Sequence, residues 1–129
     1  MEIDVGSYAD AVQEDENSKI PMNGTFDLKV IELPLQGEEV RTANGDPKMV
    51  FKLEVVNSSN PIFNGRIITH HTKIPSLFFT RILRAAKVEW ETGALNTEEI
   101  AGAMYNKTLK CIIKQIDSDS YPNIKSFIV

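Results

Sequence analysis

The sequence predicts an all-β domain with one main helix, in which five strands form the body and the helix lies between the third and fourth strands. Three observations lead to this prediction: stretches of alternating apolar and polar residues, one stretch with helical periodicity, and clusters of turn-forming residues between them. The chain has 129 residues, of which 42% are hydrophobic and 25% charged. These values are typical of one globular domain.

The first strand begins at Gly24. Phe26, Leu28 and Val30 alternate there with polar residues, which predicts a strand with one buried face. The following segment, 35–47, contains two Gly, one Pro, Asn and Asp among charged residues. This composition predicts a hairpin-type connection to the second strand.

The second and third predicted strands cover 49–56 and 66–73, with a turn at 57–61 between them. Alternation places four residues of the second strand inward: Met49, Phe51, Leu53 and Val55. Ile67 and Ile68 are adjacent, so the alternation does not show which side chains of the third strand point inward.

The predicted helix covers 77–88, with Ser76 as its N-cap. Its apolar side consists of Phe79, Ile82, Leu83 and Ala86, whereas Arg81, Arg84 and Lys87 form a basic stripe on another side. A loop at 90–97 follows, and then a short helical turn from Thr97 to about Gly102. Two final alternating strands cover 107–116 and 121–129, around a turn at 117–120.

This element order is that of the OB-fold, a five-stranded Greek-key barrel. Its second and third strands and neighbouring loops bind oligonucleotides or oligosaccharides. Other small barrels and α+β domains share parts of the order.

The charge is distributed unevenly along the chain. Residues 1–16 hold six of the 18 acidic residues and none of the 14 basic ones, so the net charge of -4 becomes +2 for the remaining 113 residues. We interpret 1–21 as an acidic N-terminal arm and 22–129 as the domain. Two interpretations of the arm stay open: a mimic of the phosphate backbone that covers a basic groove, or an inert solubilising tail. A charge of +2 permits nucleic-acid binding without indicating it.

Several classes of protein are not expected. No window is apolar enough for a membrane helix, and the N-terminus lacks the basic and apolar regions of a signal peptide. With one Cys and two His we expect no disulfide, no zinc site and no other metal or cofactor. Cys111 alternates with Leu109 and Ile113, which predicts a buried thiol. Because no phosphate-binding Gly motif, nucleophile elbow or paired catalytic carboxylates occur, we expect no enzymatic activity.

Six short segments occur in a characteristic order and spacing: GTF (24–26), FKLEV (51–55), NGRII (64–68), FTRILRAA (79–86), EIAG (99–102) and YPNI (121–124). In these segments the chain resembles the OB-fold single-stranded DNA-binding proteins of tailed bacteriophages, over about residues 22–129. The resemblance implies a protein that coats exposed strands during phage DNA replication or recombination. It also implies the cytoplasm of a bacterial host cell, a monomer or homodimer, and phage or host replication and recombination proteins as further partners.

The C-terminus departs from that family. Such proteins often end in an acidic tail that recruits replication partners, whereas this sequence ends in Ser126-Phe127-Ile128-Val129. Recruitment through a C-terminal tail is therefore in doubt, and the acidic arm is the candidate substitute.

Binding of single strands requires cations near phosphates and aromatic rings on which bases stack. The candidate residues at outward or loop positions are Lys29, Arg41, Lys48, Lys52, Phe63, Arg66, His71, Lys107 and Tyr121. Lys114 is a further cation on the fourth strand. Each lysine taken alone is more typical of a solvated surface charge, and it is their concentration on the first three strands and the first loop that favours binding. Phe63 is as well suited to closing one end of the core as to stacking on a base. We interpret Trp90, in the loop after the helix, as a residue that packs against the rest of the domain.

His70 and His71 are neighbours on a strand, so their side chains point to opposite faces and do not chelate one ion together. One is expected to be exposed, where it stacks on a base or donates to phosphate, and the other to lie in the core or at an edge. The basic stripe on the helix is interpreted as a solvated face.

The sequence therefore predicts a non-enzymatic single-stranded DNA-binding protein with little sequence preference. An OB-like protein-interaction or structural module of a replisome or virion, without nucleic-acid affinity, is the main alternative. A barrel that binds oligosaccharide is a third.

Overall fold

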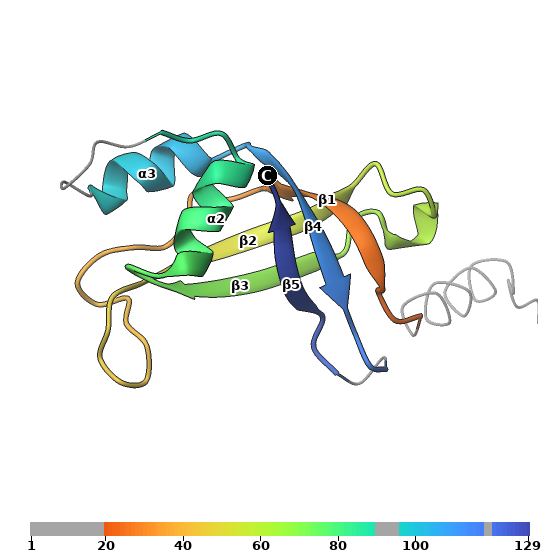
Figure 1. Ribbon diagram of the computed structural model, residues 1–129, viewed down its shortest axis with the longest axis horizontal. Coiled ribbons are helices and arrows are strands. Elements are labelled where there is room, and N and C mark those ends of the chain that lie inside the picture. Colours follow the sequence, from red (N-terminus) through yellow and green to blue (C-terminus); the bar gives the residue numbers. More distant parts are fainter. Residues whose placement is uncertain (1–19, 90–95, 118–119) are drawn as a thin grey trace, which may run out of the picture.

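A computed structural model describes residues 20–89, 96–117 and 120–129 (Figure 1). The predictions for most of the acidic arm, for Trp90 and for the centre of the 117–120 turn fall outside the described residues. Within the described ranges, neither α-helix has the length and hydropathy needed to span a membrane.

Five antiparallel strands form one sheet: β1 (Gly24–Val30), β2 (Lys48–Val56), β3 (Ile67–Lys73), β4 (Thr108–Lys114) and β5 (Asn123–Ile128). Their order in the sheet is β3-β2-β1-β4-β5, so β3 and β5 are its two edges. The sheet is curled (Figure 1), and the curl brings the edges together, because the rings of His70 on β3 and Phe127 on β5 lie 5.7 Å apart. The prediction of a mostly β protein with five strands is confirmed.

The inner face of the sheet carries the core, as the alternation predicts. Leu28, Met49, Phe51, Leu53 and Val55 are each at most 1% exposed. Cys111 is fully buried among them, and burial raises the pKa of its thiol to about 12, with the charge of Asp27 as a smaller cause. The predicted core thiol is therefore confirmed.

Helix α2 (Leu77–Ala85) follows β3, and its N-cap is the predicted one: the Ser76 hydroxyl accepts the N–H of Phe79 at 3.0 Å. The helix buries Phe79, Ile82 and Leu83 and contacts β3, β4 and β5. It ends three residues before the predicted end at residue 88. Lys87 has a left-handed backbone (φ 58°), which terminates the helix.

The segment predicted as a short turn is a second helix, α3 (Thr97–Met104), capped by Asn96. The prediction of one main helix is corrected here. Gly102 does not end this helix, because it lacks the left-handed conformation and the buried Met104 extends the apolar side by another half turn. Asn106, with φ 66°, reverses the chain instead. A 3-10 turn, η1 (Pro61–Phe63), lies between β2 and β3.

Candidate nucleic-acid interface

Cationic side chains gather on the outer face of β2 and β3, the face opposite the core. Because Met49 and Phe51 point inward, Lys48 and Lys52 project outward, next to the outward residues of β3. The register pairs Lys48 with Lys73, and Lys52 with Thr69. Like charges directly opposite one another destabilise a sheet, so the pairing of Lys48 with Lys73 is unfavourable without an anion nearby.

His71 lies beside these lysines on the outer face of β3, whereas Ile68 is buried on the inner face. The inward side chains of β3, which the adjacent Ile67 and Ile68 left open, are thereby identified. His71 is exposed, and its Nδ1 lies 3.0 Å from Nζ of Lys48. Since an ammonium group only donates, this contact makes Nδ1 the acceptor and assigns the ring proton of a neutral His71 to Nε2. We call Lys48, Lys52 and Lys73 the β2–β3 cation group, and His71 is its uncharged neighbour.

Two carboxylates lie against the β2–β3 cation group. Glu32 is 3.2 Å from Nζ of Lys52, and Asp46 is 3.6 Å from Nζ of Lys73. All four side chains are at least 42% exposed. Such exposed pairs are weak and exchange readily with other anions.

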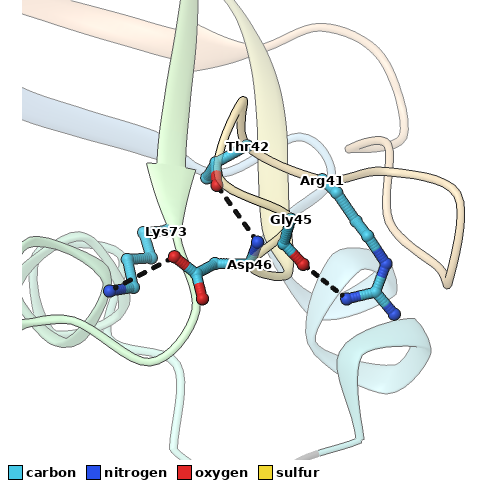
Figure 2. A network of polar contacts seen from close by, with 5 residues as sticks. All are labelled: Arg41, Thr42, Gly45, Asp46 and Lys73. Atoms are coloured by element: carbon cyan, nitrogen blue, oxygen red, sulfur yellow. Dashed lines mark hydrogen bonds and ion pairs between the residues drawn. The ribbon is translucent and has the colours of Figure 1, made fainter.

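Arg41 is directed back onto its own loop, as Figure 2 shows. Its Nε donates to the carbonyl of Glu38 at 2.7 Å, and its Nη1 donates to the carbonyl of Gly45 at 2.9 Å. The same loop is closed by a bond from the N–H of Asp46 to the Thr42 hydroxyl. The structure therefore gives Arg41 a loop-stabilising role.

Lys73 is a further cation that was not among the residues predicted from the sequence. It lies beside the loop because it forms an ion pair with Asp46. Lys73 follows His71 by two positions on a strand, and this spacing is the signal that places both side chains on one face.

Phe63 and Arg66 form a separate cluster at the turn between β2 and β3. The Phe63 ring packs edge-on against Phe26 with centroids 5.4 Å apart, and the Arg66 guanidinium lies 4.7 Å above the Phe63 ring. Arg66 also donates to the carbonyl of Ile20 at 2.7 Å. Of the two interpretations of Phe63, packing against the core is the one with contacts in the structure.

Lys29, Lys107 and Lys114 lie on the β1–β4 side of the sheet. Lys29 pairs in register with Glu54 on β2 and with Thr108 on β4, and the carbonyl of Lys107 accepts the N–H of Val30. Lys114 is exposed at the end of β4. These lysines are therefore not part of the β2–β3 cation group. The basic stripe of α2, Arg81, Arg84 and Lys87, is exposed, as predicted.

A pocket of about 640 Å³ lies where the two edges of the sheet approach each other. It is lined by residues 68–71 of β3 and by residues 121–124, which lead into β5. Tyr121 is 91% exposed. The structure thus brings together two predicted residues, His71 and Tyr121, which are 50 positions apart in the sequence.

His70 lies on the opposite face of β3 from His71, between the rings of Phe51 (6.5 Å) and Phe127 (5.7 Å). Its Nε2 is buried with no hydrogen-bond partner in the described part of the chain. Burial lowers the pKa of His70 to about 4, and the proximity of His71 contributes less. His70 is therefore the core histidine of the pair.

Among the residues that the structure describes, no group of three or more His, Cys, Asp or Glu side chains is placed to hold a metal ion. Comparison of the chain with known family models and with curated proteins finds no match.

Proposed function

We propose that this protein is a non-enzymatic, OB-fold single-stranded DNA-binding protein that coats exposed strands with little sequence preference. The strand order supports the fold. β4 returns after the long connection through α2 and α3 to lie beside β1, which matches the order of a Greek key.

The observation that carries the proposal is the position of His71. It borders the pocket together with the exposed ring of Tyr121, and it contacts Lys48 of the β2–β3 cation group. A surface on which unpaired bases stack and a row of cations for phosphates are therefore adjacent. This combination is what sequence-tolerant binding of single strands requires, and it lies on the strands that OB-folds use. The assignment to phage replication or recombination rests on the sequence resemblance.

A salt-titrated binding assay tests the proposal. We expect a fluorescently labelled oligothymidylate to bind with an affinity that falls steeply with salt. The log-log slope should be roughly -2 to -3 for three or four phosphate contacts. A duplex of the same length should bind much more weakly, and an oligoribonucleotide tests the preference for DNA. Equal affinity for duplex, or binding that does not depend on salt, contradicts the proposal. No binding to any oligonucleotide favours the protein-interaction module.

A further inference from the structure

The pocket between β3 and residues 121–124 has an unusual wall, because β3 is an edge strand of the described sheet. A strand at an edge presents a row of backbone N–H and C=O groups that its own sheet does not use. Two hydrogen bonds show which residues these are. Val55 N–H donates to Arg66 C=O at 2.9 Å, and Ile74 N–H donates to Pro47 C=O at 2.8 Å.

Both bonds obey the register of β2 and β3, and they lie at opposite ends of the pair. In an antiparallel pair, hydrogen-bonded positions alternate with non-hydrogen-bonded ones. Ile68 and His70 therefore bond to β2, whereas Thr69 and His71 direct their backbone N–H and C=O away from it. Thr69 and His71 both line the pocket. A backbone donor and acceptor thus lie side by side at the pocket wall.

The surroundings of the pocket are suited to a nucleotide. Tyr121 supplies an exposed aromatic face, and Asn123 adds an amide that both donates and accepts. Lys52 is the register partner of Thr69, and Lys48 contacts His71, so cations lie beside the same two residues. The ring of Tyr121 matches the face of a base, and the polar groups of the wall match the hydrogen-bonding edge of that base. The neighbouring lysines match the phosphate of the same nucleotide.

We propose that this pocket holds one unpaired nucleobase, which stacks on Tyr121 and presents its Watson–Crick edge to the backbone N–H and C=O of Thr69. This inference rests on the proposed function and deepens it. All four bases carry an adjacent donor and acceptor on that edge, so a backbone pair binds each of them without strong sequence preference. In a duplex the same edge is occupied by the complementary base. The pocket therefore selects for unpaired bases as such.

The test compares three labelled oligomers of about 12 nucleotides, within the range of site sizes for an OB-fold. They are oligothymidylate, its N3-methylthymine analogue, and an abasic analogue. The methyl group blocks the Watson–Crick edge and leaves the ring face and phosphates in place. We expect the methylated oligomer to bind roughly tenfold more weakly than oligothymidylate at the same salt, because a pocket donor–acceptor pair loses its partner. The salt slope should stay unchanged. Equal affinities overturn the inference and leave the proposed function standing, whereas failure to bind oligothymidylate overturns the proposed function itself.

A variant tests the wall of the pocket directly. Thr69→Pro removes the backbone N–H at a position where no bond to β2 is lost, and proline is tolerated at such edge positions. We expect this variant to lose roughly tenfold in affinity for oligothymidylate and little for the abasic oligomer. The control, Thr69→Val, keeps the N–H and should bind within about twofold of the wild type. Equal losses for the two variants overturn the inference. If circular dichroism shows that Thr69→Pro is misfolded, the comparison of the methylated and unmethylated oligomers decides whether the pocket binds the Watson–Crick edge.

Discussion

The backbone N–H of Met22 donates to Oε1 of Gln115 at 2.9 Å, although the two residues are 93 positions apart. The other end of the same amide, Nε2, donates to the carbonyl of Ser120 at 2.9 Å. Gln115 is 8% exposed. One buried side chain therefore joins the segment before β1 to the turn between β4 and β5, directly before Tyr121.

Replacing this amide should destabilise the fold. Gln115→Ala leaves the N–H of Met22 and the carbonyl of Ser120 without their partner, so we expect the free energy of unfolding to fall by about 1–3 kcal/mol. Urea denaturation followed by circular dichroism measures the loss. The control is Gln36→Ala, because Gln36 accepts one bond, from the Thr97 hydroxyl, and is less buried. A loss for Gln36→Ala as large as that for Gln115→Ala would contradict the joining role.

The β2–β3 cation group should determine the salt dependence of binding. The double variant Lys48→Ala/Lys52→Ala is expected to make the log-log salt slope shallower by about 1.4, since each phosphate contact contributes about 0.7. The matched control is Arg81→Ala/Arg84→Ala on α2, which should have a smaller effect. If the α2 pair is the more damaging one while both proteins stay folded, the DNA path runs over the helix and the assigned face is wrong.

The two aromatic candidates should separate into a stability residue and a binding residue. Phe63→Ala removes a ring packed on Phe26 and should lower the free energy of unfolding by about 1–3 kcal/mol. Tyr121→Ala should change stability by less than about 0.5 kcal/mol, because its ring is exposed. It should nevertheless weaken single-strand binding by about 1–3 kcal/mol at an unchanged salt slope. Unfolding curves and anisotropy titrations of both variants are the measurements. A Tyr121→Ala protein with unaltered affinity contradicts the stacking role.

The carboxylates beside the cation group should weaken binding. Glu32 and Asp46 pair with Lys52 and Lys73, and a phosphate that approaches these lysines has to displace them. We expect Glu32→Gln and Asp46→Asn each to tighten binding at low salt by about 1.5- to 5-fold, which corresponds to exposed pairs worth 0.2–1 kcal/mol. Glu39→Gln serves as the control, because Glu39 makes no ion pair within the described residues. Anisotropy titrations in which all three variants gain equally would show a general charge effect.

His70 should make stability depend on pH. Its pKa is about 4 in the folded protein and 6.5 as a free side chain, so the unfolded chain binds the proton more strongly. The stability that depends on a neutral His70 is therefore fully present above pH 6.5. As the pH is lowered from 6.5 to 4, the free energy of unfolding falls by up to about 3 kcal/mol. Urea denaturation at several pH values measures the trend. His70→Leu should flatten the curve in this range, whereas His71→Gln should keep most of it. A wild-type curve without this fall would place the ring of His70 in water.

Much of the fold follows from local pattern. The alternation in 24–30 and 49–56 predicts the inner face of β1 and β2, and Ser76 predicts the start of α2. These features are encoded by neighbours a few positions apart, because strand and helix periodicities relate each side chain to the one two, three or four residues along. The same parity predicts that His70 and His71 point to opposite faces. It does not show which one is buried, since that depends on Phe51 and Phe127 from other strands.

The candidate site was only partly accessible from the sequence. Outward parity predicts Lys52 as a surface group, and the position of Lys48 beside the first loop predicts the same for that residue. Parity leaves open which of His70 and His71 is exposed. Composition does not show that Arg41 turns back onto its loop, nor that Phe63 is held between Phe26 and Arg66. Both outcomes depend on partners that come close only in the folded chain: the carbonyls of Glu38 and Gly45 for Arg41, and the ring of Phe26 on β1 for Phe63.

Local patterns in the sequence were enough to predict five strands, the buried faces of β1, β2 and β4, the cap of α2 and the burial of Cys111. They did not predict that β3 and β5 form the edges of the sheet and curl toward each other, which became visible in the folded chain. This arrangement places His71 beside Tyr121 and makes Gln115 the link between Met22 and Ser120. This difference follows from the range of the interactions. Periodicity records whether a side chain is buried, whereas the pocket exists because the curl of the whole sheet brings together two edges that no local pattern relates.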